Sequence, residues 1–212
     1  MAEIVPAINV STFDEVVKRI KTAEKRSRWI HIDVADGSFT PEAVWHNASD
    51  LVNFETPALI EIHFMVNRPE DKIFPWLKTP AQRIIFHIEA TKTPGNLVKT
   101  CRNAGKEAGI SICPDSSWEE LALFVNEADL LQTLAVHPGP SGQEFDRRIL
   151  EKLKKLRVGS RVPLEVDGGV SVGIARECRD AGADFIVVGS SLFTSYRPFE
   201  KMLADLEHDI AS

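Results

Sequence analysis

Three short segments of the sequence carry imidazole and carboxylate groups at spacings that suit metal binding or proton transfer. His31 and Asp33 lie two residues apart in WIHIDVADG, His63 lies in EIHFM, and Asp167 lies in LEVDGG. Residues two apart on a β-strand project to the same side, so His31 and Asp33 are expected to face one cavity. Imidazole and carboxylate together suit zinc, iron, manganese or cobalt. The pattern therefore predicts one divalent metal ion held by residues of three strands.

Each of these residues also has an ordinary structural explanation. A histidine can be a hydrogen-bonded core residue, and an aspartate can cap a helix. For one residue alone this explanation is about as good as a functional one. For four residues at the ends of separate strands it is poor, because burying them without an ion would cost several kcal/mol.

Glycine-containing segments after the later apolar runs predict a phosphate site. They are PGPSGQ at 138–143, Gly168-Gly169 and Gly189-Ser190. Glycine lets backbone N–H groups approach an anion closely, although any single pair is as well explained by a tight turn. The predicted substrate- and phosphate-binding residues are His63, Met65, Gly139, Ser141, Gly142, Gly168, Gly169, Gly189 and Ser190.

Short apolar runs alternate with amphipathic stretches along the whole chain. Runs rich in Ile, Val and Leu predict strands at Ile4–Val10, Trp29–Val34, Ala58–Met65, Arg83–Ile88, Gly109–Cys113, Leu130–Val136, Pro163–Val166 and Phe185–Val188. Helical spacing begins after Thr12, where Thr12 and Glu15 match a capping box. Eight strands alternating with helices favour one (β/α)8 TIM barrel over residues 1–212 rather than an open doubly wound sheet. In such a barrel the active site lies where the strands end, which is where the polar residues above are found.

Composition limits the class of protein and of partner. The chain has 212 residues, of which 43% are hydrophobic and 26% are charged, as in ordinary globular proteins. Its formal charge of −6 argues against nucleic-acid binding, but not against one phosphate held by backbone N–H groups. Three distant cysteines predict reduced thiols, and no apolar run is long enough for a membrane span. We expect a cytoplasmic protein with a small-molecule partner and no membrane partner.

These segments together resemble the ribulose-phosphate 3-epimerase family. The resemblance is carried, in family order, by HIDVADGSFTP (31–41), IHFMVNRPED (62–71), FHIEATKTP (86–94), HPGPSGQEF (137–145), LEVDGGVSV (164–172) and AGADFIVVGSSLF (181–193). It implies a barrel of the ribulose-phosphate-binding type and a divalent ion on His31, Asp33, His63 and Asp167. It also implies that Asp33 and Asp167 act as acid and base, through an enediolate, on opposite faces of a sugar-phosphate substrate. The implied reaction is the isomerisation of D-ribulose 5-phosphate to D-xylulose 5-phosphate in the pentose phosphate pathway, by a protein that assembles into a homo-oligomer.

Several pocket positions depart from the family pattern. Ala7 replaces the usual Ser, and Ala35 and Leu134 each replace a usual Met. His137 and Cys113 each replace a usual Asn. Pro140-Ser141 replaces the usual Phe-Gly. These differences leave two alternatives open: an epimerase of another ketose phosphate such as D-allulose 6-phosphate, or a sugar-phosphate binder without activity. A carbon–carbon lyase on the same fold is disfavoured, because the third strand lacks the Asp-x-Lys arrangement.

Other polar and aromatic residues have two explanations each. His87 and Glu89, two residues apart at the end of the fourth strand, suit either support of the site or plain structural hydrogen bonding. His137 and Gln143 suit either a ligand contact or a role within their own loop. Trp45, Trp76 and Trp118 suit either an interface or core packing.

Overall fold

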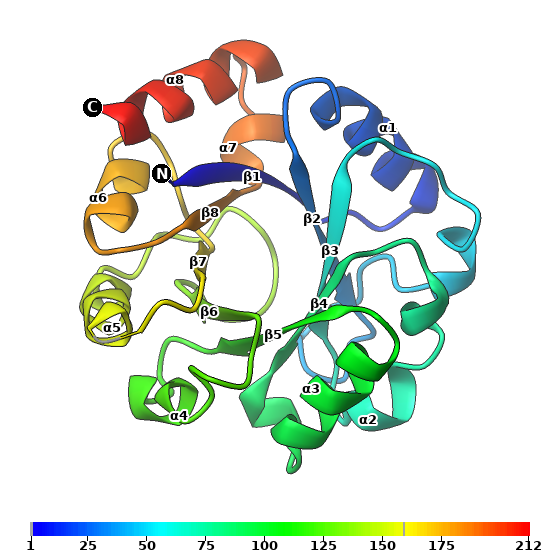
Figure 1. Cartoon of the computed structure of the whole chain (residues 1–212). Helices are drawn as coiled ribbons and strands as arrows, with labels where there is room; N and C mark the ends of the chain where they lie inside the picture. The colour runs from blue at the N-terminus through cyan, green and yellow to red at the C-terminus, as the bar shows by residue number, and fades with distance from the viewer. Residues whose placement is uncertain (1, 159) are drawn as a thin grey trace.

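The computed structural model describes residues 2–158 and 160–212. Within those residues eight parallel strands pair in chain order and close into a barrel, with helices on the outside (Figure 1). The strands are β1 (Glu3–Ile8), β2 (Trp29–Ala35), β3 (Leu59–Met65), β4 (Arg83–His87), β5 (Glu107–Ile112), β6 (Leu130–Leu134), β7 (Leu164–Asp167) and β8 (Phe185–Val188). The predicted (β/α)8 barrel is therefore confirmed.

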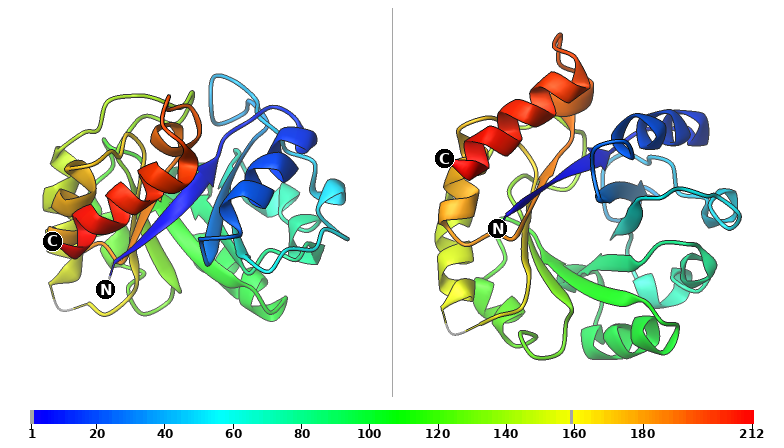
Figure 2. Two further views of the ribbon diagram at one scale, coloured as in Figure 1. Left: turned by 90° about the horizontal axis from the view of Figure 1, so that it is seen from above. Right: turned by 45° about the horizontal axis from the view of Figure 1, so that its top comes forward.

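The helices cover the outer face of the strands. They are α1 (Phe13–Ala23), α2 (Pro69–Lys72), α3 (Pro94–Asn103), α4 (Trp118–Ala122), α5 (Arg148–Arg157), α6 (Ile174–Asp180), α7 (Ser190–Phe193) and α8 (Phe199–Ala211). The Pro-rich stretch after β3 forms only the single turn α2 and a short 3-10 turn, Trp76–Lys78. Helix α8 packs against β1 and α6, across the seam where the barrel closes (Figure 2). No helix in the described part of the chain is long and apolar enough to cross a membrane.

The local start of α1 has the N-cap half of the capping box that the sequence predicts. Thr12 is the N-cap, and its hydroxyl accepts a hydrogen bond from the backbone N–H of Glu15. The Thr12 hydroxyl also contacts the Glu15 carboxylate at 3.1 Å. This cap stabilises the first turn of the helix that follows β1.

Strand register aligns the predicted site residues in neighbouring rows. Asp33 pairs with His63 between β2 and β3, and His31 pairs with Glu61. Asp167 on β7 pairs with Leu134 on β6. Pairing of β1 with β8, from Glu3 opposite Phe185 to Pro6 opposite Val188, closes the ring.

Seven of the eight strands differ from their predicted bounds by one or two residues at an end, and only β8 has both bounds as predicted. β1 ends at Ile8 because the carbonyl of Val10 accepts a hydrogen bond from Trp45, in the loop after β2. β6 ends at Leu134 because the carbonyl of Ala135 bonds to the N–H of Asp146. β7 begins at Leu164 and extends to Asp167.

The core has an outer and an inner part. Strands and helices enclose the larger apolar cluster, which includes Trp45 and Trp76, so these two tryptophans pack in the core. A smaller cluster of Val5, Ala7, Trp29 and Val187 lies apart from it. Several polar side chains are fully or almost fully buried as well: His31, Glu61, His63, Arg83, His87, Ser111, Gln132 and Glu165.

Candidate active site

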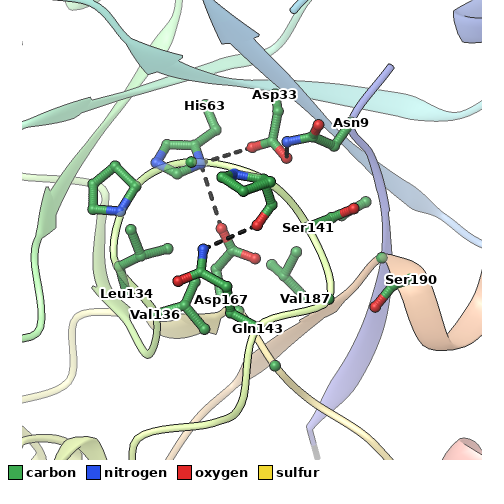
Figure 3. Close-up of a pocket in the computed structure, with 18 of the residues that line it drawn as sticks. Asn9, Asp33, His63, Leu134, Val136, Ser141, Gln143, Asp167, Val187 and Ser190 are labelled. Carbon is green, nitrogen blue, oxygen red and sulfur yellow. Dashed lines mark hydrogen bonds and ion pairs between the residues drawn. The ribbon is translucent and has the colours of Figure 1, made fainter. Parts of the chain in front are cut away.

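Four side chains from three strands meet at the end of the barrel where the strands terminate, and Figure 3 shows three of them, Asp33, His63 and Asp167. Nδ1 of His63 lies 2.9 Å from Oδ1 of Asp33 and 3.4 Å from Oδ2 of Asp167. Nε2 of His31 lies 3.5 Å and 3.8 Å from the same two oxygens. One ligand atom from each residue lies within 4.8 Å of all the others. The structure therefore brings together the four residues that the sequence predicts as metal ligands.

The arrangement of donor atoms fits a small divalent cation. Ligands about 2.0–2.1 Å from an ion at the centre of a tetrahedron are separated by roughly 3.3 Å, and the four separations given above lie on either side of that value. Nε2 of His31 is fully buried and has no hydrogen-bond partner in the described part of the chain. A buried imidazole nitrogen without a partner is costly in protein alone and is satisfied by coordination.

The charges of the cluster also favour a divalent cation. Burial alone would lower the pKa of His31, but the carboxylates of Asp33 and Glu61 outweigh it and raise that pKa well above its usual value. Burial would also lower the pKa of His63, but Asp167 and Asp33 outweigh burial and raise that pKa. Burial would raise the pKa of Asp33, yet His31 and His63 hold it far below its usual range. The carboxylates thus favour positive charge at this point, which a divalent cation would supply.

Asn9, which follows β1, is a site residue that the sequence analysis missed. Its Nδ2 donates a hydrogen bond to Oδ2 of Asp33 over 2.9 Å (Figure 3). The Asp33 carboxylate is therefore divided, with Oδ1 toward the histidines and Oδ2 toward Asn9. The only signal in the sequence is a polar residue at the position where an apolar strand ends.

A second group that was missed lies deeper in the barrel. Glu61 accepts from Nη1 of Arg83 at 2.7 Å, and its other oxygen lies 2.8 Å from Nδ1 of His31. Glu165 accepts from Nε2 of Gln132 at 2.9 Å. Burial, and then the nearby Glu61 carboxylate, raise the pKa of Glu165 well above its usual value. The signal was available, because Glu61 and Glu165 precede His63 and Asp167 by two residues and so face the same side.

His87 and Glu89 extend the cluster from β4. Nε2 of His87 lies 2.9 Å from Nε2 of His63, and its Nδ1 lies 3.4 Å from Oε2 of Glu89. Cys113 is the third member, with Sγ 3.6 Å from the same Nδ1. Burial would raise the pKa of Glu89, but His87, Ser116 and the N–H of Cys113 lower it to about 2. His87 and Glu89 therefore lie beside the site rather than in an unrelated structural pair.

A pocket opens above the four residues and contains every predicted substrate-binding position. Its wall includes the predicted residues His63, Met65, Gly139, Ser141, Gly142, Gly168, Gly169, Gly189 and Ser190. Ala7, Leu134, Val136 and Val187 supply an apolar wall. Ala35 lines an adjoining pocket instead. The pocket thus combines apolar side chains with glycine-containing turns.

Gly169 shows why the glycine loops cannot carry larger residues. Its φ of +69° lies in the left-handed region, and a Cβ there would lie 2.7 Å from the backbone N of Phe145. The loop after β6 therefore packs directly on the turn after β7. Gln143 braces this loop by donating from Nε2 to the carbonyls of His137 and Pro140, each at 2.9 Å. His137 is exposed and lies 3.7 Å from Asp115, which is a contact with a neighbouring loop.

Comparisons with known proteins agree with this geometry. The model of the "Ribulose-phosphate 3 epimerase family" matches residues 3–193. A ribulose-phosphate 3-epimerase from Chlamydia pneumoniae is 34% identical over 84% of this chain and 81% of that protein. The cytoplasmic isoform of ribulose-phosphate 3-epimerase from Oryza sativa subsp. japonica is 30% identical over 96% of this chain and 92% of that one.

Among solved structures, 3-hexulose-6-phosphate synthase from Salmonella typhimurium superposes with a TM-score of 0.74. Its sequence identity is 14%, and the match covers 99% of this chain and 98% of that one, so it supports the fold alone. Epimerases of ketose phosphates are isomerases, and the match to their family model over residues 3–193 assigns this barrel to that activity class. The chain belongs to the ribulose-phosphate 3-epimerase family.

Proposed function

We propose that the protein is a metal-dependent 3-epimerase that interconverts D-ribulose 5-phosphate and D-xylulose 5-phosphate. The observation that carries the proposal is the convergence of His31, Asp33, His63 and Asp167 beside one pocket, which Asp33, His63 and Asp167 line. His31 and His63 would hold the ion through Nε2 and Nδ1, with one oxygen from each aspartate. When bound, zinc, iron, manganese or cobalt would polarise the substrate carbonyl as a Lewis acid.

Proton transfer is assigned to the two aspartates. Asp33 projects from β2 and Asp167 from β7, and both line the pocket. Each uses one oxygen at the ion site, which leaves the other to face the substrate. One carboxylate removes the proton at C3, and the other returns a proton to the opposite face, which inverts that carbon. The carboxylates are held ready for this by His63, which contacts both.

Substrate binding is assigned to the rest of the pocket. Backbone N–H groups of the turns at Gly168-Gly169 and Gly189-Ser190 would bind the phosphate, since glycine allows close approach of the backbone. Met65 and the apolar wall would pack against the sugar carbons and exclude water. Ala7 lacks the hydroxyl that the family pattern has at this position, so we expect a weaker hold on the sugar than in typical members.

The test is solvent exchange in deuterated water. Metal-loaded protein is incubated with D-ribulose 5-phosphate, and deuterium at C3 and xylulose 5-phosphate are measured by NMR. A parallel incubation with D-allulose 6-phosphate tests the alternative substrate. Deuterium at C3 and xylulose 5-phosphate, formed from D-ribulose 5-phosphate, would support the proposal. Faster turnover of D-allulose 6-phosphate would identify that sugar as the substrate instead. Tight binding of both sugars by calorimetry without any exchange would establish the non-catalytic alternative.

The metal is tested separately by removal. Dialysis against a chelator is expected to abolish exchange, and addition of a divalent ion is expected to restore it. Elemental analysis of the purified protein identifies the ion. Full activity in protein shown to be free of metal would contradict this part of the proposal.

A further inference from the structure

We propose that two buried hydrogen-bond chains hold His31 and His63 in opposite tautomers, so that each presents the correct nitrogen to the ion. Glu61, backed by Arg83, serves His31, and His87, backed by Glu89, serves His63. These four are positioning residues, and the inference rests on the metal centre proposed above. Glu61 lies on β3, whereas Arg83 and His87 lie at the two ends of β4.

The first chain fixes the proton on Nδ1 of His31. Glu61 is buried, and its carboxylate accepts from Arg83 at 2.7 Å, so it is an anion that can only accept hydrogen bonds. Its Oε1 lies 2.8 Å from Nδ1 of His31, which must therefore donate. The lone pair of His31 then lies on Nε2, the atom that has no hydrogen-bond partner within the described residues.

Arg83 is itself rigidly placed. Its guanidinium lies 4.2 Å from the centre of the Trp29 ring, and it also bonds Glu107. A planar guanidinium held by stacking and by two carboxylates keeps Glu61 in one orientation. The orientation of the His31 ring is thus set from the base of the barrel upward.

The second chain works in the opposite sense. His63 faces the ion site with Nδ1, and its Nε2 lies 2.9 Å from Nε2 of His87. Two ring nitrogens at that distance require one donor and one acceptor. When Nδ1 of His63 gives its lone pair to an ion, the proton of that ring is on Nε2, and His87 must accept. The proton of His87 is then on Nδ1, which lies 3.4 Å from Oε2 of Glu89.

This assignment also explains a second cluster. His87, Glu89 and Cys113 offer nitrogen, oxygen and sulfur close together, as a metal site would. The second chain requires a proton on Nδ1 of His87, so that nitrogen has no lone pair for a second ion while the first ion is bound. Glu89 is therefore an acceptor for His87, and its other oxygen is already bonded to Ser116 and to the N–H of Cys113.

The first experiment measures zinc affinity by calorimetry. Loss of such a supporting partner typically weakens metal binding by roughly 10–100-fold. We expect that weakening for Glu61→Gln, because an amide has only one oxygen and cannot accept from both Arg83 and His31. We expect it also for His87→Leu, which removes the acceptor for His63. His87→Gln retains an acceptor and is expected to recover part of the affinity. Glu177→Gln, in a surface pair with Arg147, is the matched control and should bind zinc as the unaltered protein does.

The second experiment needs no substitution and reads the tautomers directly. Nitrogen-15 NMR of the zinc-loaded protein should show His31 protonated on Nδ1, and His63 protonated on Nε2. The opposite assignment for either histidine overturns the proposal. This result does not depend on whether the variants fold, because the experiment uses the unaltered protein. Unchanged zinc affinity in folded Glu61→Gln and His87→Leu overturns it as well. If the unaltered protein binds no zinc or other divalent ion, the proposed metal centre fails, and this inference fails with it.

Discussion

Asn9 donates a hydrogen bond to Oδ2 of Asp33 over 2.9 Å, while Oδ1 of the same carboxylate lies 2.9 Å from Nδ1 of His63. The two oxygens of Asp33 thus have different partners. An amide donor leaves a second lone pair on Oδ2 for the substrate. This relationship gives each oxygen one task in the proposed reaction.

Replacing Asn9 tests that division of tasks. Asn9→Leu removes the donor at similar volume, so Oδ2 of Asp33 loses its orientation toward the substrate. A hydrogen bond to a charged group contributes about 1.5–3 kcal/mol, so we expect kcat to fall by roughly 10–100-fold with a smaller change in KM. Steady-state kinetics with D-ribulose 5-phosphate measures this, and Asn53→Leu at an exposed position is the control. An unchanged kcat would show that Asp33 is oriented without Asn9.

Asp167→Asn tests the second proton-transfer group. The amide can still occupy the same space but cannot take up a proton, and general acid–base catalysis typically contributes 10²–10⁴-fold. We expect deuterium exchange at C3 to fall by roughly that factor, beyond any loss of zinc affinity measured on the same variant. Asp180→Asn, in a surface pair with Arg179, should leave exchange unchanged. Retention of full exchange by Asp167→Asn would remove Asp167 from the mechanism.

Gly169→Ala and Gly105→Ala form a matched pair. Both glycines have similar left-handed φ values, +69° and +74°, so both substitutions cost about 1–2 kcal/mol from the backbone alone. A Cβ on Gly105 meets nothing within 4 Å, whereas a Cβ on Gly169 meets the backbone of Phe145. Urea unfolding should therefore show a larger loss of stability for Gly169→Ala. Its KM for the sugar phosphate should also rise, while that of Gly105→Ala should not; equal effects would mean that the close approach at Gly169 has no functional part.

Asp209 gives a pH-dependent prediction away from the site. This buried carboxylate on α8 accepts from the backbone N–H groups of Gly173 and Arg176, at 2.7 and 3.1 Å. Burial would raise its pKa, but these bonds and the Arg176 guanidinium lower it below the usual 3.8. A lowered folded-state pKa stabilises the fold above pH 3.8, and that stability is lost as the pH falls through the folded value.

Asp209→Asn should therefore reduce the free energy of unfolding by about 2 kcal/mol at neutral pH. The difference between the variant and the unaltered protein should shrink as the pH falls below 3.8. Urea titrations at pH 7 and at successively lower pH measure it. A difference that stays constant over this range would contradict the assignment of the stabilisation to the charged carboxylate.

The sequence predicted the barrel and the four converging residues because both depend on short-range periodicity. Alternation along β2 places His31 and Asp33 on one side, and parallel strands bring their ends to one edge. The partners Arg83 and Gln132 were not predicted, because they depend on register between strands, which no single strand encodes. Asn9 was missed for a related reason: β1 ends two residues earlier than its apolar pattern, and the Asn9 side chain after it bonds to Asp33 on β2.

Pairing of β8 with β1 has a consequence for how the protein is made. The carboxylate on β7 arrives long after the ligands on β2 and β3 have left the ribosome, and the ring has open edges until β8 docks on β1. A nascent chain therefore exposes unpaired strand edges, and an incomplete set of charges, for most of its synthesis. Binding of the proposed cation and closure of the ring should therefore occur late and together. Truncated chains are then expected to stay unfolded and inactive.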